Sequence, residues 1–166
     1  MWPRRRPDPV RVTLCPVTVG RHLAVRAAAG VGYVEGEGGD GPPPEFAAMP
    51  SADLLAVLDA ALVDPPARMR DRPALVALAA AVWDAWTEAA EEATQTGLAR
   101  ARLVVLHTGQ GMGGEGDTEA PPPEMLAAQM TLPEWAAVRE MPLWEAVMQR
   151  AASASLERFQ KALSLN

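Results

Sequence analysis

The chain has 166 residues, of which 15 are Lys or Arg and 21 are Asp or Glu, so its formal net charge at pH 7 is −6. A chain of this length forms one hydrophobic core or two small lobes. The acidic balance argues against general affinity for nucleic acid, which needs clustered basic residues, and we expect no nucleic-acid partner. The single cysteine excludes an intramolecular disulfide and a multi-thiolate zinc site.

The beginning of the chain is basic but does not resemble a signal peptide. Residues 1–9 contain three Pro and three Arg, which predicts an extended basic arm that is either solvated or in contact with an acidic partner. The apolar stretch that a signal peptide needs is broken by Arg11, Thr13 and Pro16. Because every apolar run is also shorter than the ~20 residues that span a bilayer, we expect a cytoplasmic protein without membrane contact.

The first predicted elements are a short strand and a helix. Apolar and polar residues alternate over residues 10–14, which favours a β-strand, and Pro16 ends it. Thr18 is a suitable N-cap for a helix that extends to about Ala29, and Gly30 provides its stop signal.

Residues 31–50 are rich in Gly, Pro and acidic side chains, which predicts a flexible acidic loop. A second helix follows, with Ser51 as its predicted cap and Asp64-Pro65-Pro66 as its stop. Its apolar residues have helical spacing and form one face: Leu54, Leu55, Leu58, Ala61 and Leu62.

The longest predicted helix begins near Pro73. Its apolar stripe, which includes two tryptophans, consists of Leu75, Leu78, Ala79, Val82, Trp83 and Trp86. The opposite face is acidic, so we expect a half-buried helix whose tryptophans pack the main core. Gly97 is expected to interrupt it. The pattern leaves open whether residues 100–107 continue the helix after a kink or form a strand.

The predicted fold is therefore mainly α: a helical domain over residues 10–107, a Gly/Pro-rich linker over 108–123 and a helical piece over 124–166. Pro142 is expected to open the last helix. This short piece either docks onto the preceding domain or offers apolar surface to another chain, and the two are compatible. Its predicted partner-binding residues are Trp135, Leu143, Trp144, Met148, Leu156 and Phe159.

Two patterns in the sequence are candidate sites of chemistry, and neither predicts an enzyme. Residues 109–114 fit G-x-G-x-x-G, but acidic residues and three prolines follow where a phosphate-binding helix should begin, so a linker is the favoured interpretation and nucleotide binding the alternative. Cys15 and His22 are better explained as packing residues than as a thiolate–imidazole pair. We predict no catalytic residue, no metal and no cofactor.

Residues 14–23, with the sequence LCPVTVGRHL, resemble the opening of small tail-module proteins of long-tailed bacteriophages. The layout of a helical domain, a loose joint and a Trp-containing helical piece is similar to that of phage tail assembly chaperones. This resemblance implies a cytoplasmic, non-enzymatic protein of a bacterial host that holds apolar helical segments of the tape-measure or tube protein during virion assembly. The alternatives are a virion structural component or a small inhibitor of a host enzyme, and self-association remains open.

Overall fold

The computed structural model describes residues 12–31, 43–107 and 136–164, and for residues 104–107 and 154–164 it describes the backbone alone. As predicted, the chain is mainly helical. The principal helices are α1 (Val19–Ala28), α2 (Ser51–Ala61), α3 (Arg72–His107) and α6 (Leu143–Ser164). Within the described residues, none of the helices has both the length and the apolar composition needed to cross a bilayer.

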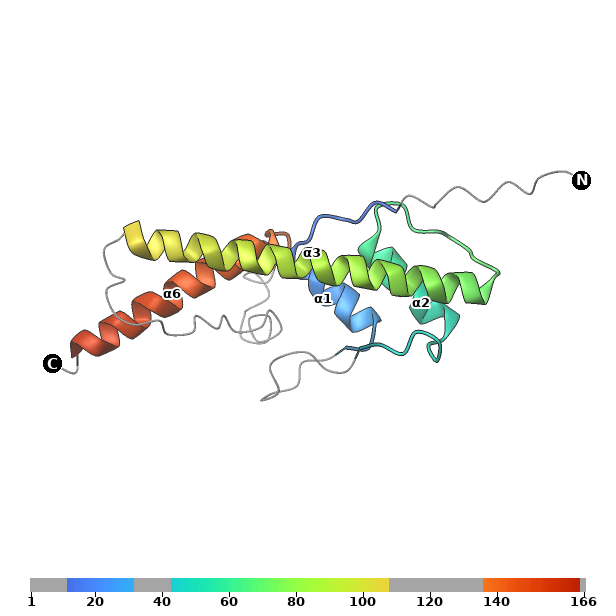
Figure 1. Cartoon of the computed structure of the whole chain (residues 1–166), viewed down its shortest axis with the longest axis horizontal. Helices are drawn as coiled ribbons and strands as arrows, with labels where there is room; N and C mark the ends of the chain where they lie inside the picture. The colour runs from blue at the N-terminus through green and yellow to red at the C-terminus, as the bar shows by residue number, and fades with distance from the viewer. Residues whose placement is uncertain (1–11, 32–42, 108–135, 165–166) are drawn as a thin grey trace, which may run out of the picture.

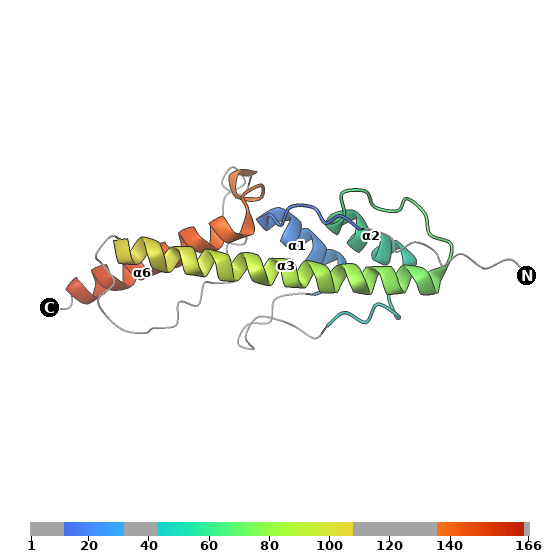
Figure 2. The same cartoon turned by 45° about the horizontal axis from the view of Figure 1, so that its top comes forward.

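Helix α3 lies along the longest dimension of the molecule (Figure 1). The shorter helices α1 and α2 pack together beside its N-terminal half, and α6 starts near its middle and runs in the same direction along its C-terminal half (Figures 1 and 2). The structure thus places the C-terminal helix on the preceding domain, which is the docked arrangement that the sequence left open.

The start of the described chain agrees in part with the prediction. The Thr18 side chain accepts a hydrogen bond from the Arg21 amide and caps α1, and Gly30 follows the helix with a φ of 70°, a conformation that favours glycine. The predicted strand over residues 10–14 is not confirmed: of its described residues 12–14, Leu14 alone pairs, in an isolated antiparallel bridge with Leu62. Residues 10–11 lie outside the described part of the chain.

The predicted Ser51 cap is wrong. Pro50 occupies the cap position of α2 without a side-chain hydrogen bond. The Ser51 hydroxyl instead accepts a bond of 3.0 Å from the Arg72 guanidinium, which also donates to the carbonyls of Ala47 and Met49 at 3.0 and 2.8 Å. A long-range arginine contact has therefore replaced the local cap and ties the start of α3 to the turn before α2.

Both ends of the predicted acidic loop pack against the core. Val31 is buried, and Phe46 lies against Trp83 with a distance of 6.2 Å between ring centroids. The intervening residues 32–42 lie outside the described part of the chain, as does the predicted linker.

The expected interruption at Gly97 is also wrong, because α3 continues through it to His107. The same observation settles residues 100–107 as helix. A Cβ at position 97 would lie 2.8 Å from the Val147 Cβ and closer still to the Trp144 carbonyl oxygen, both on α6. Gly97 therefore allows close contact between two helix backbones instead of marking the end of one.

The buried side chains form two main clusters along α3. The first holds α1, α2 and the N-terminal half of α3 together and includes the predicted Trp86, which is 1% exposed. The second joins α1, the middle of α3 and the start of α6: Val19, Ala90, Leu143, Ala146 and Val147. The predicted apolar faces of α2 and α3 are confirmed by the first cluster.

Candidate functional site

Residues 13–20 connect three parts of the fold through backbone hydrogen bonds. On one side, the Cys15 amide donates to the Ala61 carbonyl at 2.8 Å, and the Val63 amide donates to the Thr13 carbonyl at 3.0 Å. Both bonds reach the end of α2, so this segment fixes where α2 stops relative to the beginning of α1.

On the other side, the same segment holds the beginning of α6. The Val19 amide donates to the Met141 carbonyl at 3.0 Å, and the Leu143 amide donates to the Val17 carbonyl at 2.9 Å. The Gly20 amide donates to the Arg139 carbonyl at 2.8 Å. A Cβ at position 20 would lie 2.9 Å from that same oxygen. Only glycine, which lacks a Cβ, therefore lets the two backbone segments come this close.

A groove lies beside this connection, between α3 and the start of α6. We call it the junction groove. Its volume is about 330 Å³, it is open to solvent, and its lining is Pro16, Val17, Thr18, Ala89, Glu92, Ala93, Thr96, Pro142 and Trp144. Each α3 residue in this set has another member three or four positions away, so the set lies on one side of the helix. The lining is chiefly apolar, which suits an apolar side chain.

Trp144 is half-buried and forms part of the groove wall. The Arg100 guanidinium carbon lies over its ring, 4.0 Å from the ring centroid. A cation at this distance is attracted by the electron-rich face of the indole, and the contact stabilises the orientation of the ring. Two helices, α3 and α6, thus fix the position of this wall.

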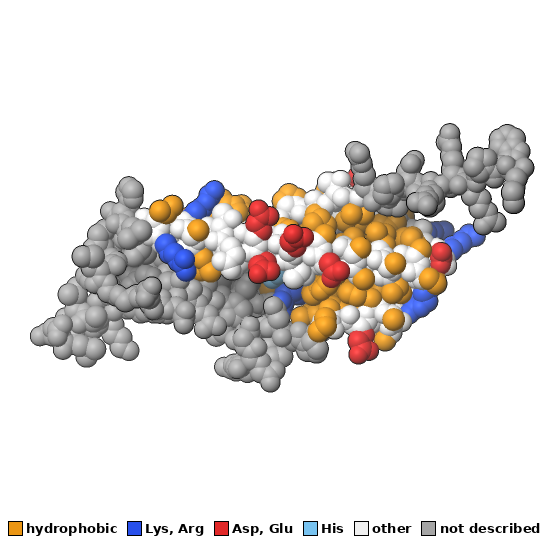
Figure 3. Space-filling view, in the orientation of Figure 1, with side chains coloured by type: hydrophobic (Ala, Val, Ile, Leu, Met, Phe, Trp, Pro, Cys, Tyr) orange, Lys and Arg blue, Asp and Glu red, His pale blue; other side chains and the backbone are white. Residues whose placement is uncertain are grey.

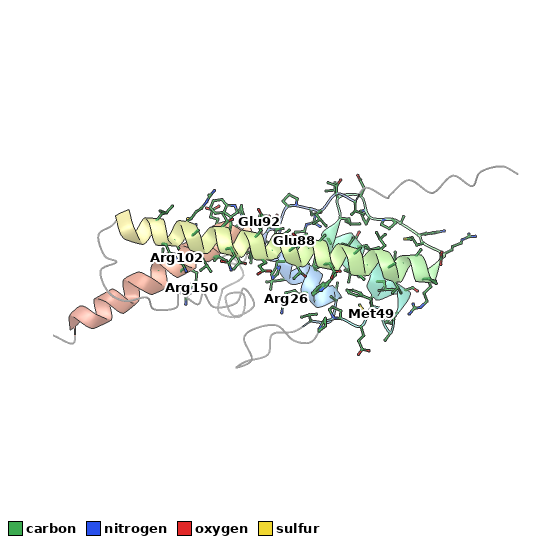
Figure 4. All side chains as sticks on the ribbon, in the orientation of Figure 1. Arg26, Met49, Glu88, Glu92, Arg102 and Arg150 are labelled. Carbon is green, nitrogen blue, oxygen red and sulfur yellow. The ribbon has the colours of Figure 1, made fainter. Side chains whose placement is uncertain are left out.

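One acidic residue of α3 lines the groove, and another is exposed nearby on the same helix. Glu92 lines the groove and is exposed, and Glu88 is exposed one helical turn before it. Figure 4 shows these two side chains next to each other at the middle of α3, and Figure 3 shows further acidic side chains on the same stretch of helix. An apolar groove with the Glu92 carboxylate in its lining favours a ligand that carries both apolar and positively charged groups.

The predicted partner-binding residues have different positions. Trp144 lines the groove, and Met148, one turn further along α6, is half-buried. Leu143 is 1% exposed and packs in the second core cluster, where it holds α6 on α3. Trp135 and the side chains of Leu156 and Phe159 lie outside the described part of the chain.

Sequence reasoning missed the α3 wall of the groove. Ala89, Ala93 and Thr96 carry little chemistry, and Glu92 belongs to the acidic side of a helix that the sequence predicts to be half-buried. Their common feature is helical spacing, which shows that they share a face but not that residues 16–18 lie opposite it. The glycine pattern at 109–114 lies outside the described residues.

The described residues contain no group of three or more His, Cys, Asp or Glu side chains that could hold a metal ion. The Cys15 side chain is buried in the first core cluster. No family model matches the chain, and comparisons with curated proteins and with solved structures find no significant match.

Proposed function

We propose that this chain works by protein–protein contact, as an assembly chaperone of the phage-tail type that holds apolar helical segments of a tape-measure or tube protein. The observation that carries the proposal is the junction groove. It is open, mainly apolar, and placed where the C-terminal helix joins the rest of the molecule. An exposed apolar groove of this kind suits an apolar anchor residue from a partner helix.

The position of residues 14–23 supports the same proposal. This segment carries the resemblance to phage tail proteins, and Pro16, Val17 and Thr18 within it form one wall of the groove. The Val17 carbonyl also accepts the hydrogen bond that anchors the first residue of α6. The resemblance therefore falls on residues that shape the proposed binding surface.

The charge distribution suits a chaperone that is soluble before it binds. The net charge is −6, and Glu88, Glu91 and Glu92 are exposed on α3. A net charge well away from zero limits non-specific association of a protein with exposed apolar surface. Half-buried Met148 adds an adaptable side chain near the groove, because methionine fits varied apolar partners.

Binding by substituted chains tests this proposal. We expect Trp144→Ala and Met148→Ala to weaken capture of apolar helical segments of tape-measure or tube protein in a co-purification assay. Gln149→Ala is the matched control, since Gln149 is exposed on the same helix and its side-chain amide bonds Glu145 within that helix. Thermal melting of each variant separates lost binding from lost folding. Unchanged capture by the Trp144 variant would contradict the assignment of the groove.

Purified particles separate an assembly chaperone from a structural subunit. We expect the chain in assembling tails and not in mature virions. A fixed copy number in mature particles would favour the structural alternative.

A further inference from the structure

We propose that α6 is a detachable wall of the junction groove. It leaves α3 as one unit while the N-terminal lobe, formed by α1, α2 and the N-terminal half of α3, stays folded. Its departure opens the groove and releases an occupant. The release of an occupant rests on the proposed function, whereas the detachment of α6 is a property of the free chain and is tested without a partner.

The core of the N-terminal lobe does not need α6. Among the described residues, neither the buried members of the first core cluster nor the half-buried side chains packed against them come from α6. The cluster contains Phe46, Trp86 and four buried leucines. Because hydrophobic stabilisation grows with the apolar area removed from water, this core keeps its main stabilisation when α6 leaves.

The contacts that hold α6 are separate and involve smaller side chains. The start of α6 contributes Leu143, Ala146 and Val147 to the second core cluster, and Val19 and Ala90 are the buried residues that they meet. This cluster is therefore lost as a whole when α6 leaves. A unit with its own small core and its own backbone bonds opens at a lower free energy than the rest of the molecule.

Detachment removes one side of the groove. Pro142 and Trp144 line it from the start of α6, whereas the other lining residues belong to α3 and to residues 16–18. Backbone hydrogen bonds between residues 17–20 and 139–143 hold this wall, and water replaces them when it leaves. A ligand that touches both sides binds only the docked form, so the ligand and the docked α6 stabilise each other.

Thiol labelling of the free chain compares the two units. Val147→Cys puts a thiol in the α6 contact, at a position that is 8% exposed, and adds no volume. Cys15, 6% exposed in the first cluster, is the internal reference. With a reagent that reacts more slowly than the chain recloses, each rate reports the fraction of open molecules. We expect the thiol at position 147 to react more than about tenfold faster than Cys15. Equal rates would overturn the proposal.

A weakened N-terminal lobe gives a second test. Leu75 is 1% exposed near the first residue of α3, whereas α6 lies along the C-terminal half of that helix (Figure 1). Leu75→Ala should raise the reaction rate of Cys15 at least about tenfold and leave the rate at position 147 unchanged. Val63→Ala, at a residue that is 52% exposed, is the control and should change neither rate. An equal increase at both thiols would show one cooperative unit and contradict a detachable α6.

Hydrogen exchange of the unsubstituted chain in low urea gives the same comparison without a destabilising change. The amides of Ala146 and Val147 should open with a smaller dependence on urea than those of Leu58 and Val82. The reason is that detachment of α6 exposes less surface than unfolding of the lobe. One common urea dependence for all four amides would refute a separate α6 unit.

A bound partner tests the release of an occupant. A tube or tape-measure protein that occupies the groove at about 100 times its Kd should slow the reaction at position 147 about 100-fold. Binding without this slowing would overturn the coupling between α6 and the groove and leave the proposed function intact. Absence of binding would contradict the proposed function, while the rates of the free chain would still decide whether α6 detaches.

Discussion

Replacing Gly97 by alanine tests how α6 is held on α3, because helix propensity and packing predict opposite signs. Alanine in place of an interior helical glycine normally stabilises a protein by about 1 kcal/mol. At this position, however, the new Cβ would lie 2.8 Å from the Val147 Cβ and closer to the Trp144 carbonyl oxygen. Neither atom can move away by side-chain rotation, so the helices must separate.

Overpacking of this kind costs about 1–3 kcal/mol. Because backbone atoms are involved, we place the cost at the upper end, and the propensity gain leaves a net loss of about 2 kcal/mol in the free energy of unfolding. Urea unfolding followed by circular dichroism measures this quantity. Hydrogen exchange should locate the change at α6, with faster exchange of the Leu143 and Val147 amides.

An exposed position in the same helix gives the control. Gln95 is exposed two residues before Gly97, so Gln95→Ala should be more stable than Gln95→Gly by about 0.5–1 kcal/mol. The order of Ala and Gly should reverse at position 97. If Gly97→Ala is as stable as the parent chain or more stable, the close α3–α6 contact described above is refuted.

Three further substitutions test other contacts. Gly20→Ala should destabilise the chain by about 1 kcal/mol and accelerate hydrogen exchange at the start of α6, since its Cβ would press on the Arg139 carbonyl; unchanged exchange there would contradict this contact. Arg72→Gln should cost about 1 kcal/mol and expose the turn before α2 to proteolysis, since the guanidinium bonds to that turn are lost; a protease-resistant turn would argue otherwise. A double-mutant cycle with Arg100→Ala and Trp144→Leu should give a coupling free energy of about 0.5–1 kcal/mol, whereas additive effects would deny the cation–π contact.

The parts of the fold that depend on local chemistry were predictable from the sequence. Thr18 and Gly30 enclose α1 as expected, because a cap hydrogen bond and a positive φ act within a few residues. The burial of Trp86 followed from the helical spacing of its apolar neighbours.

The errors came from contacts between segments that are distant in sequence. Gly97 has the appearance of a helix break, but its lack of a side chain serves the contact with α6. Ser51 has the right chemistry for a cap, but Arg72, 21 residues away, uses its hydroxyl. The groove was missed for the same reason, since its α3 wall and residues 16–18 meet only in the folded chain.

Site-specific photocrosslinking tests whether the junction groove binds a protein segment during assembly. A benzophenone amino acid is placed at position 144, in the groove wall, or at position 149, on the exposed side of α6, in cells that are assembling tails. The proposal predicts that position 144 forms a crosslink to the tape-measure or tube protein and that position 149 does not. Equal crosslinking from both positions, or crosslinking to neither protein from position 144, would contradict it.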